Sequence, residues 1–308
     1  MATERRVLVD GGQTGIRLRI VDGTSVSEHT TGPVQTDHPV IVQIAAAVAD
    51  IVRSLGISVH AVAAGVSGLT PGACRPQELL TELTEVGVRR VALAHDSVTA
   101  YLAANGFERG AVTAVGTGVV TLGVGPAGVA RVDGWGNLVG DAGSAYWIGR
   151  AGLDAALRAF DGRGPATELE SAAVSEFGPL PELYMVLQGA PDRVSRTAGF
   201  ARTVDEAARH DDAVAIDISR RASGELAASV AAALRRSGQR ADSAPRVSWL
   251  GKVLSSNELI RSRFIELIGC EVPHCVVAPP FGEPLDGVEL LLDLPSDHPL
   301  SAQVGQAG

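Results

Sequence analysis

Two short glycine-rich segments carry hydroxyl side chains at corresponding places in the two halves of the chain. The first is Asp10-Gly11-Gly12-Gln13-Thr14 and the second is Gly116-Thr117-Gly118. Glycine leaves backbone N–H groups open to an anion, and threonine adds a hydroxyl donor. Either turn alone is more typical of an ordinary hairpin. Their recurrence at the start of each half favours a pair of phosphate-binding turns.

Two carboxylates stand at the ends of predicted strands. Asp10 could accept a turn N–H or hold Mg²⁺ through water, because magnesium bound to phosphates takes only one or two carboxylates. Asp96, in His95-Asp96-Ser97, could be the N-cap of the apolar helix that follows. At the carboxyl end of a strand, it could instead accept the proton of a hydroxyl that attacks phosphorus. Both alternatives remain open for each residue.

A third segment, 134–144, is too rich in glycine to be packed core. It contains Gly134-Trp135-Gly136 and Gly140-Asp141-Ala142-Gly143-Ser144. Asp141 or Ser144 could cap the next helix and Trp135 could be a core indole, or the loop could hold a pyranose with Asp141 bonding its hydroxyls. A further turn, beginning at Gly251-Lys252, lies between a predicted strand and a predicted helix and is a weak ligand-binding signal.

The first hundred residues alternate between strand and helix patterns, which indicates an α/β domain with a mixed sheet. The predicted strands are Arg6–Asp10, Ile16–Ile20, Val59–Gly65 and Val88–Ala94, and the predicted helices are Val40–Leu55, Pro76–Val86 and Val98–Ala104. Because the first glycine turn joins strand to strand, it is neither a Walker loop nor a dinucleotide fingerprint, which both precede a helix.

At Gly110 the strand, glycine turn, strand order begins again, which suggests a structural duplication. The second half has predicted strands Val112–Val115, Val119–Val124, Val247–Leu250 and Val272–Ala278, and predicted helices Ser144–Phe160, Ser256–Ile268 and Pro284–Leu292. Residues 167–236 are almost wholly helical in pattern. We expect domains at 1–109 and 110–294, with helix 284–292 able to pack back on the first domain, and a loose tail at 295–308.

The composition favours small-molecule partners in a reducing compartment. A net charge of −9 over 308 residues argues against nucleic acid or an anionic membrane as partner. Three scattered cysteines support neither a disulfide framework nor a zinc site. No stretch reaches the roughly 20 apolar residues that span a bilayer, so a cytoplasmic enzyme is expected.

Taken together, these motifs resemble the BadF/BadG/BcrA/BcrD-type ATPase family, and most closely its N-acetylglucosamine kinase branch. Asp10–Thr14 is similar to the first phosphate motif, DGGGTKT, and Val115–Gly118 to the second. The densest match is Asp133–Arg150, DGWGNLVGDAGSAYWIGR, against the pattern GGWGxxxGDEGSxYWIGxxAL. Trp249–Leu254 stands where the family has an adenosine-contacting segment.

The resemblance implies two ribonuclease H-like (actin-like) domains with an interdomain cleft, and an ATP- and Mg²⁺-dependent kinase that phosphorylates an amino sugar, commonly on its 6-hydroxyl. Asp96 would be the general base, Asp10 the magnesium-side carboxylate, and Thr14 and Thr117 phosphate ligands. The sugar would contact Asp141 and the turn 134–136, and we expect Ser144 and Thr36 to face it as well. Family members are often homodimers.

Several residues depart from the family pattern. Gln13 replaces the third glycine of the first motif, and Lys252 replaces the second glycine of the adenosine segment. Val119 stands where the kinases usually have serine, and Ala142 replaces the glutamate of GDEG. Because loss of a polar partner in a buried site costs about 1–3 kcal/mol, such changes can redirect the choice of sugar.

Two alternatives to a kinase follow from these observations. The departures at Gln13, Val119 and Ala142 motivate a non-catalytic sugar sensor of the same fold. The other branch of the family, a reductase-activating ATPase, needs cysteines for an iron–sulfur cluster at a subunit interface. Cys74, Cys270 and Cys275 do not supply the expected pair, which disfavours this branch.

Overall fold

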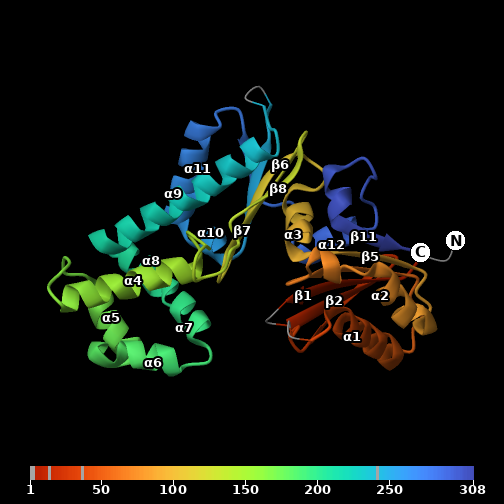
Figure 1. Cartoon of the computed structure of the whole chain (residues 1–308), viewed down its shortest axis with the longest axis horizontal. Helices are drawn as coiled ribbons and strands as arrows, with labels where there is room; N and C mark the ends of the chain where they lie inside the picture. The colour runs from red at the N-terminus through yellow and green to blue at the C-terminus, as the bar shows by residue number, and fades with distance from the viewer. Residues whose placement is uncertain (1–3, 13–14, 36–37, 241–242) are drawn as a thin grey trace. The chain divides into compact units, whose positions relative to one another are not determined.

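The computed structural model describes residues 4–12, 15–35, 38–240 and 243–308 (Figure 1). The chain forms two compact units. Unit 1 comprises Met1–Arg109, Val124–Val129 and Pro279–Gly308, and unit 2 comprises Gly110–Gly123 and Ala130–Ala278. The chain thus enters unit 2 at Gly110, where the strand and turn pattern repeats, and returns to unit 1 at Val124–Val129 and again from Pro279.

Unit 1 is built on a six-stranded mixed sheet with the order β11-β5-β4-β1-β2-β3. The strands are β1 (Arg6–Gly12), β2 (Gly15–Asp22), β3 (Ser25–Thr31), β4 (Ala61–Val66), β5 (Arg90–His95) and β11 (Val304–Ala307). The strands β1, β4 and β5 are parallel, because helical connections return the chain to the same end of the sheet. Their carboxyl ends therefore meet at one edge, and β4 is buried along its whole length.

The helices of unit 1 follow the apolar spacing of the sequence. They are α1 (Val40–Leu55), α2 (Pro76–Leu83), α3 (Asp96–Asn105) and α12 (Pro284–Leu290), with short 3-10 turns at Pro71–Ala73, Thr84–Val86 and Pro299–Gln303. The predicted range of α1 is confirmed, and Gly56 ends it with a left-handed φ of 62°. The α-helix at Pro76 is shorter than predicted, because its last turn tightens to 3-10 geometry.

Two strands of unit 1 are absent from the sequence prediction, and one of them overturns the loose tail expected at 295–308. Val304–Ala307 is strand β11, which pairs antiparallel with β5. The strand β3 is polar and largely exposed, yet it pairs with β2 along seven residues. Backbone hydrogen bonds to a sheet edge need no apolar pattern, so hydropathy does not reveal either strand.

Unit 2 contains a five-stranded sheet with the order β10-β9-β6-β7-β8. The strands are β6 (Gly110–Val115), β7 (Val119–Gly125), β8 (Gly128–Val132), β9 (Arg246–Leu250) and β10 (Val276–Val277). The strands β6, β9 and β10 are parallel. The sequence predicts β10 as Val272–Ala278, whereas helix α11 continues to Glu271 and leaves a two-residue strand. None of the predicted strands corresponds to β8.

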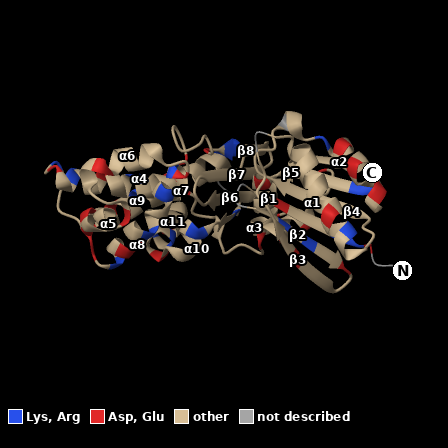
Figure 2. Ribbon diagram, turned by 90° about the horizontal axis from the view of Figure 1, so that it is seen from below, with Lys and Arg blue, Asp and Glu red and all other residues tan. Residues whose placement is uncertain are grey.

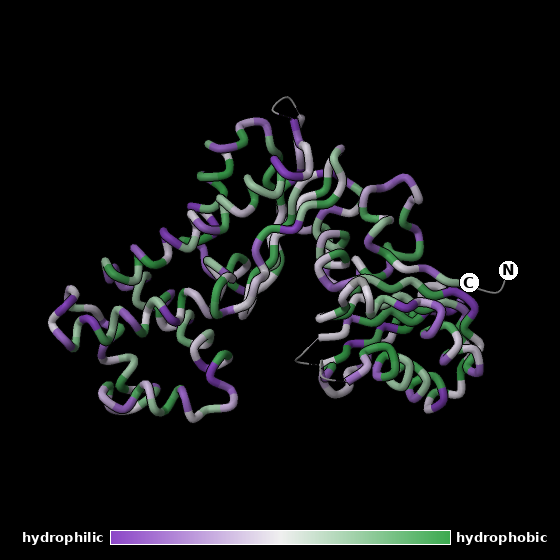
Figure 3. The backbone as a smooth tube through the Cα atoms, in the orientation of Figure 1, coloured by the Kyte–Doolittle hydropathy of each residue, from purple (hydrophilic) through white to green (hydrophobic). Residues whose placement is uncertain are grey.

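The rest of unit 2 is helical, as the pattern over 167–236 predicts. The helices are α4 (Ala145–Phe160), α5 (Glu168–Phe177), α6 (Leu183–Gly189), α7 (Arg193–Gly199), α8 (Ala201–Arg209), α9 (Ala213–Arg236), α10 (Lys252–Ser256) and α11 (Glu258–Glu271), with a 3-10 turn at Leu180–Glu182. Apolar residues of these helices and of β6, β7 and β9 form one core, and unit 1 has its own. Figure 3 shows the hydrophobic strands of each sheet in green.

Charges of both signs are interspersed on the helices of unit 2 (Figure 2). Pairs four residues apart join Arg158 to Asp154, Arg209 to Asp205 and Arg221 to Asp217. In the part of the chain that the structure describes, no helix is long and apolar enough to cross a membrane.

Candidate functional site

The carboxyl edge of the unit 1 sheet brings the first glycine turn next to Asp96. Ser67, which directly follows β4, lies between the two. Its backbone N–H donates to the carbonyl oxygen of Gly11 at 2.8 Å, and its hydroxyl donates to Asp96 Oδ2. Ser67 thus joins the end of β1, through its backbone N–H, to the candidate base at the end of β5, through its hydroxyl.

Asp96 is the first residue of α3, and the N-cap of that helix is His95. The N-cap alternative for Asp96 is therefore wrong, because the preceding residue occupies that position. The Asp96 carboxylate lies at a helix N-terminus, where the helix dipole favours negative charge. It remains half-buried and available at the sheet edge.

The surroundings of Asp96 keep its carboxylate ionised. His95 Nδ1 lies 2.8 Å from Asp96 Oδ1. Burial alone would raise the pKa of Asp96, but the hydrogen bond and charge of His95, with the hydroxyl of Ser67 and the N–H of Ser97, hold the pKa below its ordinary value. The group is thus ready to accept a proton at neutral pH.

Asp10 makes an ion pair across the first hairpin of unit 1. Arg17 lies directly opposite Asp10 in the register of β1 and β2. Its guanidinium donates to Asp10 Oδ2 from Nη2 at 2.6 Å and from Nε at 3.2 Å. The pair engages only one carboxylate oxygen, and it places the Arg17 guanidinium beside Asp10 at the start of the first glycine turn.

The second glycine turn, 116–118, is tied to the start of α4. The N–H of Gly116 donates to the carbonyl of Gly118 at 2.9 Å. The N–H groups of Ala145 and Tyr146 donate to the carbonyls of Gly116 and Thr117 at 2.9 and 3.1 Å. Thr117 itself is exposed, so its hydroxyl is free to meet a ligand from solvent.

Asp141 packs directly against this second turn. A methyl group placed on Gly118 would lie only 2.6 Å from Asp141 Oδ2, so the close approach requires glycine there. The N–H of Gly136 donates to Asp141 Oδ1 at 3.3 Å, and Asp141 as a whole is 7% exposed. The structure thus joins the glycine turn and the loop 133–144 into one site within unit 2.

Trp135 and Ser144 have different surroundings from Asp141. The Trp135 indole is 68% exposed, so it is not a core residue, and the Arg131 guanidinium lies 5.7 Å from its ring centre. Ser144 is fully buried, and its hydroxyl accepts the N–H of Trp147 at 3.2 Å as the N-cap of α4. Of the two alternatives for Ser144, the geometry favours the helix cap.

The turn at Gly251 lies beside the second glycine turn because β9 pairs with β6, with Leu250 opposite Ala114. Gly251 has a left-handed φ of 90°, and a methyl group on it would lie 2.3 Å from the carbonyl oxygen of Val115. This position therefore requires glycine on two counts. Lys252 begins α10 and is exposed at the same end of the sheet.

The sequence profile of the BadF/BadG/BcrA/BcrD ATPase family matches residues 9–278. The chain belongs to this family. The match spans both glycine turns, Asp96 and the loop 133–144, and it ends where the chain returns to unit 1.

One curated relative matches this BadF-family chain over a short segment. It is the N-acetylmuramic acid/N-acetylglucosamine kinase of Clostridium acetobutylicum, 44% identical over 70 residues. The segment covers 22% of this chain and only 23% of the relative.

Two solved structures share the fold of this BadF-family chain. A proposed N-acetylglucosamine kinase from Chromobacterium violaceum has a TM-score of 0.72 and 24% identity, covering 95% of this chain and 100% of its own. A ROK-family transcriptional regulator, a homologue of the E. coli MLC protein, has a TM-score of 0.58 and 13% identity, covering 94% of this chain and 78% of its own. At these identities the likeness establishes the two-unit α/β fold.

The BadF family implies use of ATP, and the described residues suit a magnesium ion carried by the nucleotide. No group of three or more His, Cys, Asp or Glu side chains that could hold a metal occurs in the described ranges. A Mg²⁺ ion bound to phosphates needs only one or two carboxylates. Asp10, with one carboxylate oxygen engaged by Arg17, has its other oxygen to supply as such a ligand.

Three predicted site residues, Gln13, Thr14 and Thr36, lie outside the described residues. Sequence reasoning missed two others, Ser67 and Asp133. A signal for Ser67 was present, because a small hydroxyl residue in Val-Ser-Gly directly after a buried strand stands at the ligand-binding edge of an α/β sheet. Asp133 gave no signal, because its contacts depend on how the loop folds back.

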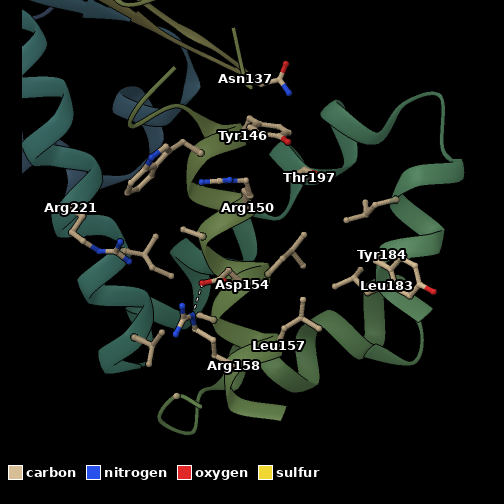
Figure 4. Close-up of a pocket in the computed structure, with 18 of the residues that line it drawn as sticks. Asn137, Tyr146, Arg150, Asp154, Leu157, Arg158, Leu183, Tyr184, Thr197 and Arg221 are labelled. Atoms are coloured by element: carbon tan, nitrogen blue, oxygen red, sulfur yellow. Dashed lines mark hydrogen bonds and ion pairs between the residues drawn. The ribbon is translucent and has the colours of Figure 1, made fainter. Parts of the chain in front are cut away.

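Unit 2 also contains a large groove, to which Asn137 and Leu138 of loop 133–144 contribute. Its volume is about 1110 Å³, and helices α4, α6, α7 and α9 line it. Figure 4 shows Tyr146, Arg150, Asp154 and Arg158 following one another along α4, with an ion pair of 2.9 Å joining Arg158 to Asp154. None of the predicted catalytic, phosphate-binding or sugar-binding residues borders this groove.

Proposed function

We propose that this chain is a cytoplasmic, ATP- and Mg²⁺-dependent kinase that phosphorylates a hydroxyl of an amino sugar, with the 6-hydroxyl as the acceptor. The observation that carries the proposal is the arrangement around Ser67. It connects a glycine turn suited to phosphate with an ionised carboxylate that can act as a base. Membership of an ATPase family and the short kinase-like segment support the same conclusion.

In this mechanism the backbone N–H groups of each glycine turn, and those of the turn at Gly251-Lys252, can bind phosphate oxygens of a nucleotide. Asp96 accepts the proton of the sugar hydroxyl as its oxygen attacks the terminal phosphorus of ATP. A P–O bond to the sugar forms and the bond to the ADP oxygen breaks. Bound Mg²⁺ would neutralise phosphate charge, with Asp10 as its protein-side carboxylate.

The sugar would contact loop 133–144. Asp141 offers carboxylate oxygens to hydroxyls, and the exposed Trp135 indole offers a flat apolar face for a pyranose. Val119 is 4% exposed at the end of the second glycine turn, where a kinase of the family usually has serine. A buried apolar residue there removes one polar partner, which favours a sugar that lacks the matching hydroxyl contact.

A substrate panel tests this proposal. ADP release should be measured with ATP and Mg²⁺ in the presence of N-acetylglucosamine, glucosamine, N-acetylmannosamine, N-acetylmuramic acid and glucose. We expect sugar-dependent ADP formation with an amino sugar, and a product whose phosphorus-31 and proton spectra place the phosphate on oxygen 6. Absence of sugar-dependent ADP across the panel would contradict the kinase assignment.

A second candidate function is a sugar sensor without kinase activity. The buried Val119 and the presence of a transcriptional regulator among proteins of this fold favour it. The two candidates separate in a binding experiment. A sensor binds a sugar in calorimetry and releases no ADP, whereas a kinase binds the sugar and also releases ADP.

The hydroxyl of Ser67 gives a prediction about pH. In Ser67→Ala the Asp96 carboxylate loses a donor that favours its charged form, so its pKa should rise toward the ordinary value. Protonated Asp96 cannot accept a proton, so the acidic limb of the kcat profile should move to higher pH. Near neutral pH the Asp96 carboxylate is ionised in both proteins, so kcat there should change little.

The matched control for Ser67 is Ser54→Ala, which removes an exposed hydroxyl that bonds only the Ile51 carbonyl on α1. Its pH profile should coincide with that of the unmodified chain. If Ser67→Ala also leaves the acidic limb in place, the hydroxyl does not influence Asp96.

A further inference from the structure

Two aspartates of loop 133–144 have backbone conformations that side chains rarely adopt. Asp133 and Asp141 both have a left-handed φ of 57°. A left-handed conformation costs free energy for residues other than glycine, although aspartate tolerates it better than most because its side chain can bond locally. Such positions persist only where surrounding contacts hold them.

The Asp133 carboxylate provides those contacts. Its Oδ1 accepts the N–H of Asp141 at 2.8 Å, and its Oδ2 accepts the N–H of Ala142 at 2.9 Å. Both oxygens of one side chain thus join the first residue of the loop to residues eight and nine positions later. The loop is thereby closed at its base.

Neighbouring contacts secure the same closure. A methyl group on Gly140 would lie 2.7 Å from Asp133 Oδ1 and 2.7 Å from Trp135 Cβ, so the returning chain passes close to the carboxylate. Arg131 donates from Nη2 to the carbonyl of Gly134 at 2.5 Å while its guanidinium lies over Trp135. Arg131 thus fixes the start of the loop, while Asp133 holds the backbone at Asp141 and Ala142.

We propose that Asp133 is a positioning residue, whose carboxylate closes loop 133–144 and thereby holds the Asp141 carboxylate against Gly118. The inference rests on the proposed function, because it gives Asp141 the role of sugar ligand. Asp133 itself does not touch the sugar. Its contribution is to fix the backbone from which Asp141 projects, at the point where Oδ2 meets the second glycine turn.

The charge of Asp133 acts on Asp141 as well. Burial raises the pKa of Asp141, the N–H groups of Gly136 and Val119 and the charge of Arg131 lower it, and the negative charge of Asp133 raises it. The charged groups around Asp141 in this cluster are Arg131 and Asp133. Removing the Asp133 charge should therefore lower the pKa of Asp141, so that its carboxylate stays ionised down to a lower pH.

Two variants separate the contacts from the charge. Asp133→Gly removes both acceptors while keeping a residue that tolerates left-handed φ, so backbone strain does not confuse the result. Asp133→Asn removes the charge and keeps one carbonyl acceptor. The control is Asp212→Gly at the N-cap of α9. Asp212 Oδ1 accepts two adjacent N–H groups, from Val214 and Ala215 at 3.0 and 2.9 Å, and its Oδ2 accepts the Thr167 hydroxyl and the Glu168 N–H.

The experiment combines hydrogen exchange of the loop with kinetics. In Asp133→Gly we expect faster exchange of the amides of Asp141 and Ala142, and a sugar KM raised about tenfold to hundredfold with the ATP KM within about twofold. Asp133→Asn should recover part of the sugar KM and shift the acidic limb of kcat/KM for the sugar to lower pH. Asp212→Gly should change neither loop exchange nor the sugar KM.

The outcomes distinguish this inference from the proposed function. Unchanged loop exchange in Asp133→Gly overturns the positioning role, and so does faster exchange with an unchanged sugar KM. If the unmodified chain turns over no sugar of the panel, the proposed function fails. Calorimetry with the same sugars then compares Asp133→Gly with the unmodified chain. An unchanged sugar affinity in Asp133→Gly overturns the positioning role, and so does the absence of sugar binding by the unmodified chain.

Discussion

Asp96→Asn is expected to lower kcat for sugar phosphorylation by about 10³-fold, the order that a positioned general base contributes. Asparagine keeps the size of the side chain and can still accept the hydroxyl of Ser67, but it cannot take up the proton of the attacking hydroxyl. The dissociation constants of nucleotide and sugar should stay within about threefold, because the loss concerns the transition state. Single-turnover kinetics and calorimetry measure the two quantities.

Asp50→Asn is the control for a lost carboxylate in unit 1. Asp50 is exposed on α1, 3.9 Å from Arg53, and its replacement should leave kcat unchanged. A fall in kcat of less than about tenfold in Asp96→Asn would remove Asp96 from the role of general base. Loss of sugar binding together with turnover would instead make it a substrate ligand.

Replacing the two glycines of the second turn should affect the two substrates separately. In Gly118→Ala the new methyl group would lie 2.6 Å from Asp141 Oδ2. The Asp141 carboxylate must then move, so we expect loss of sugar binding at least tenfold and a fall of about 1–3 kcal/mol in the free energy of unfolding. Sugar titration calorimetry and urea unfolding measure both.

Gly116→Ala is its partner variant in the same turn. A methyl group on Gly116 meets no atom of the described chain within 4 Å, so the free energy of unfolding and the sugar affinity should be kept. If a phosphate approaches this backbone, the methyl group obstructs it, and the nucleotide should bind about tenfold more weakly. Equal nucleotide affinity in Gly116→Ala and the unmodified chain would argue against a phosphate at this turn.

Much of the fold follows from local patterns. The alternation of Ile16, Leu18 and Ile20 with arginine predicts β2, and the apolar spacing over Val40–Leu55 predicts α1 at its observed bounds. Both elements bury one apolar face, which in α1 includes Ile44 and Val48. Segments that bury one face against a core can be predicted from the sequence, because their apolar residues must recur with the period of the helix or strand.

Hydropathy patterns do not predict the two strands at the edges of the unit 1 sheet. The strand β3 exposes most of its side chains, and β11 is four residues long. Their free energy of formation comes from hydrogen bonds to a strand already in place. That partner is distant in sequence for β11, which pairs with β5 some two hundred residues earlier. No window of sequence contains both strands.

By themselves, the residues determined the chemical groups of the candidate site: glycine turns for an anion, a carboxylate at the end of β5, and a glycine-rich loop with Asp141. The tertiary structure decided their partners. It placed Ser67 between Gly11 and Asp96, paired Asp10 with Arg17, made His95 rather than Asp96 the helix cap, and closed loop 133–144 through Asp133. The type of a side chain is local information, whereas the pKa and orientation of a carboxylate depend on donors and charges that only folding brings within hydrogen-bonding distance.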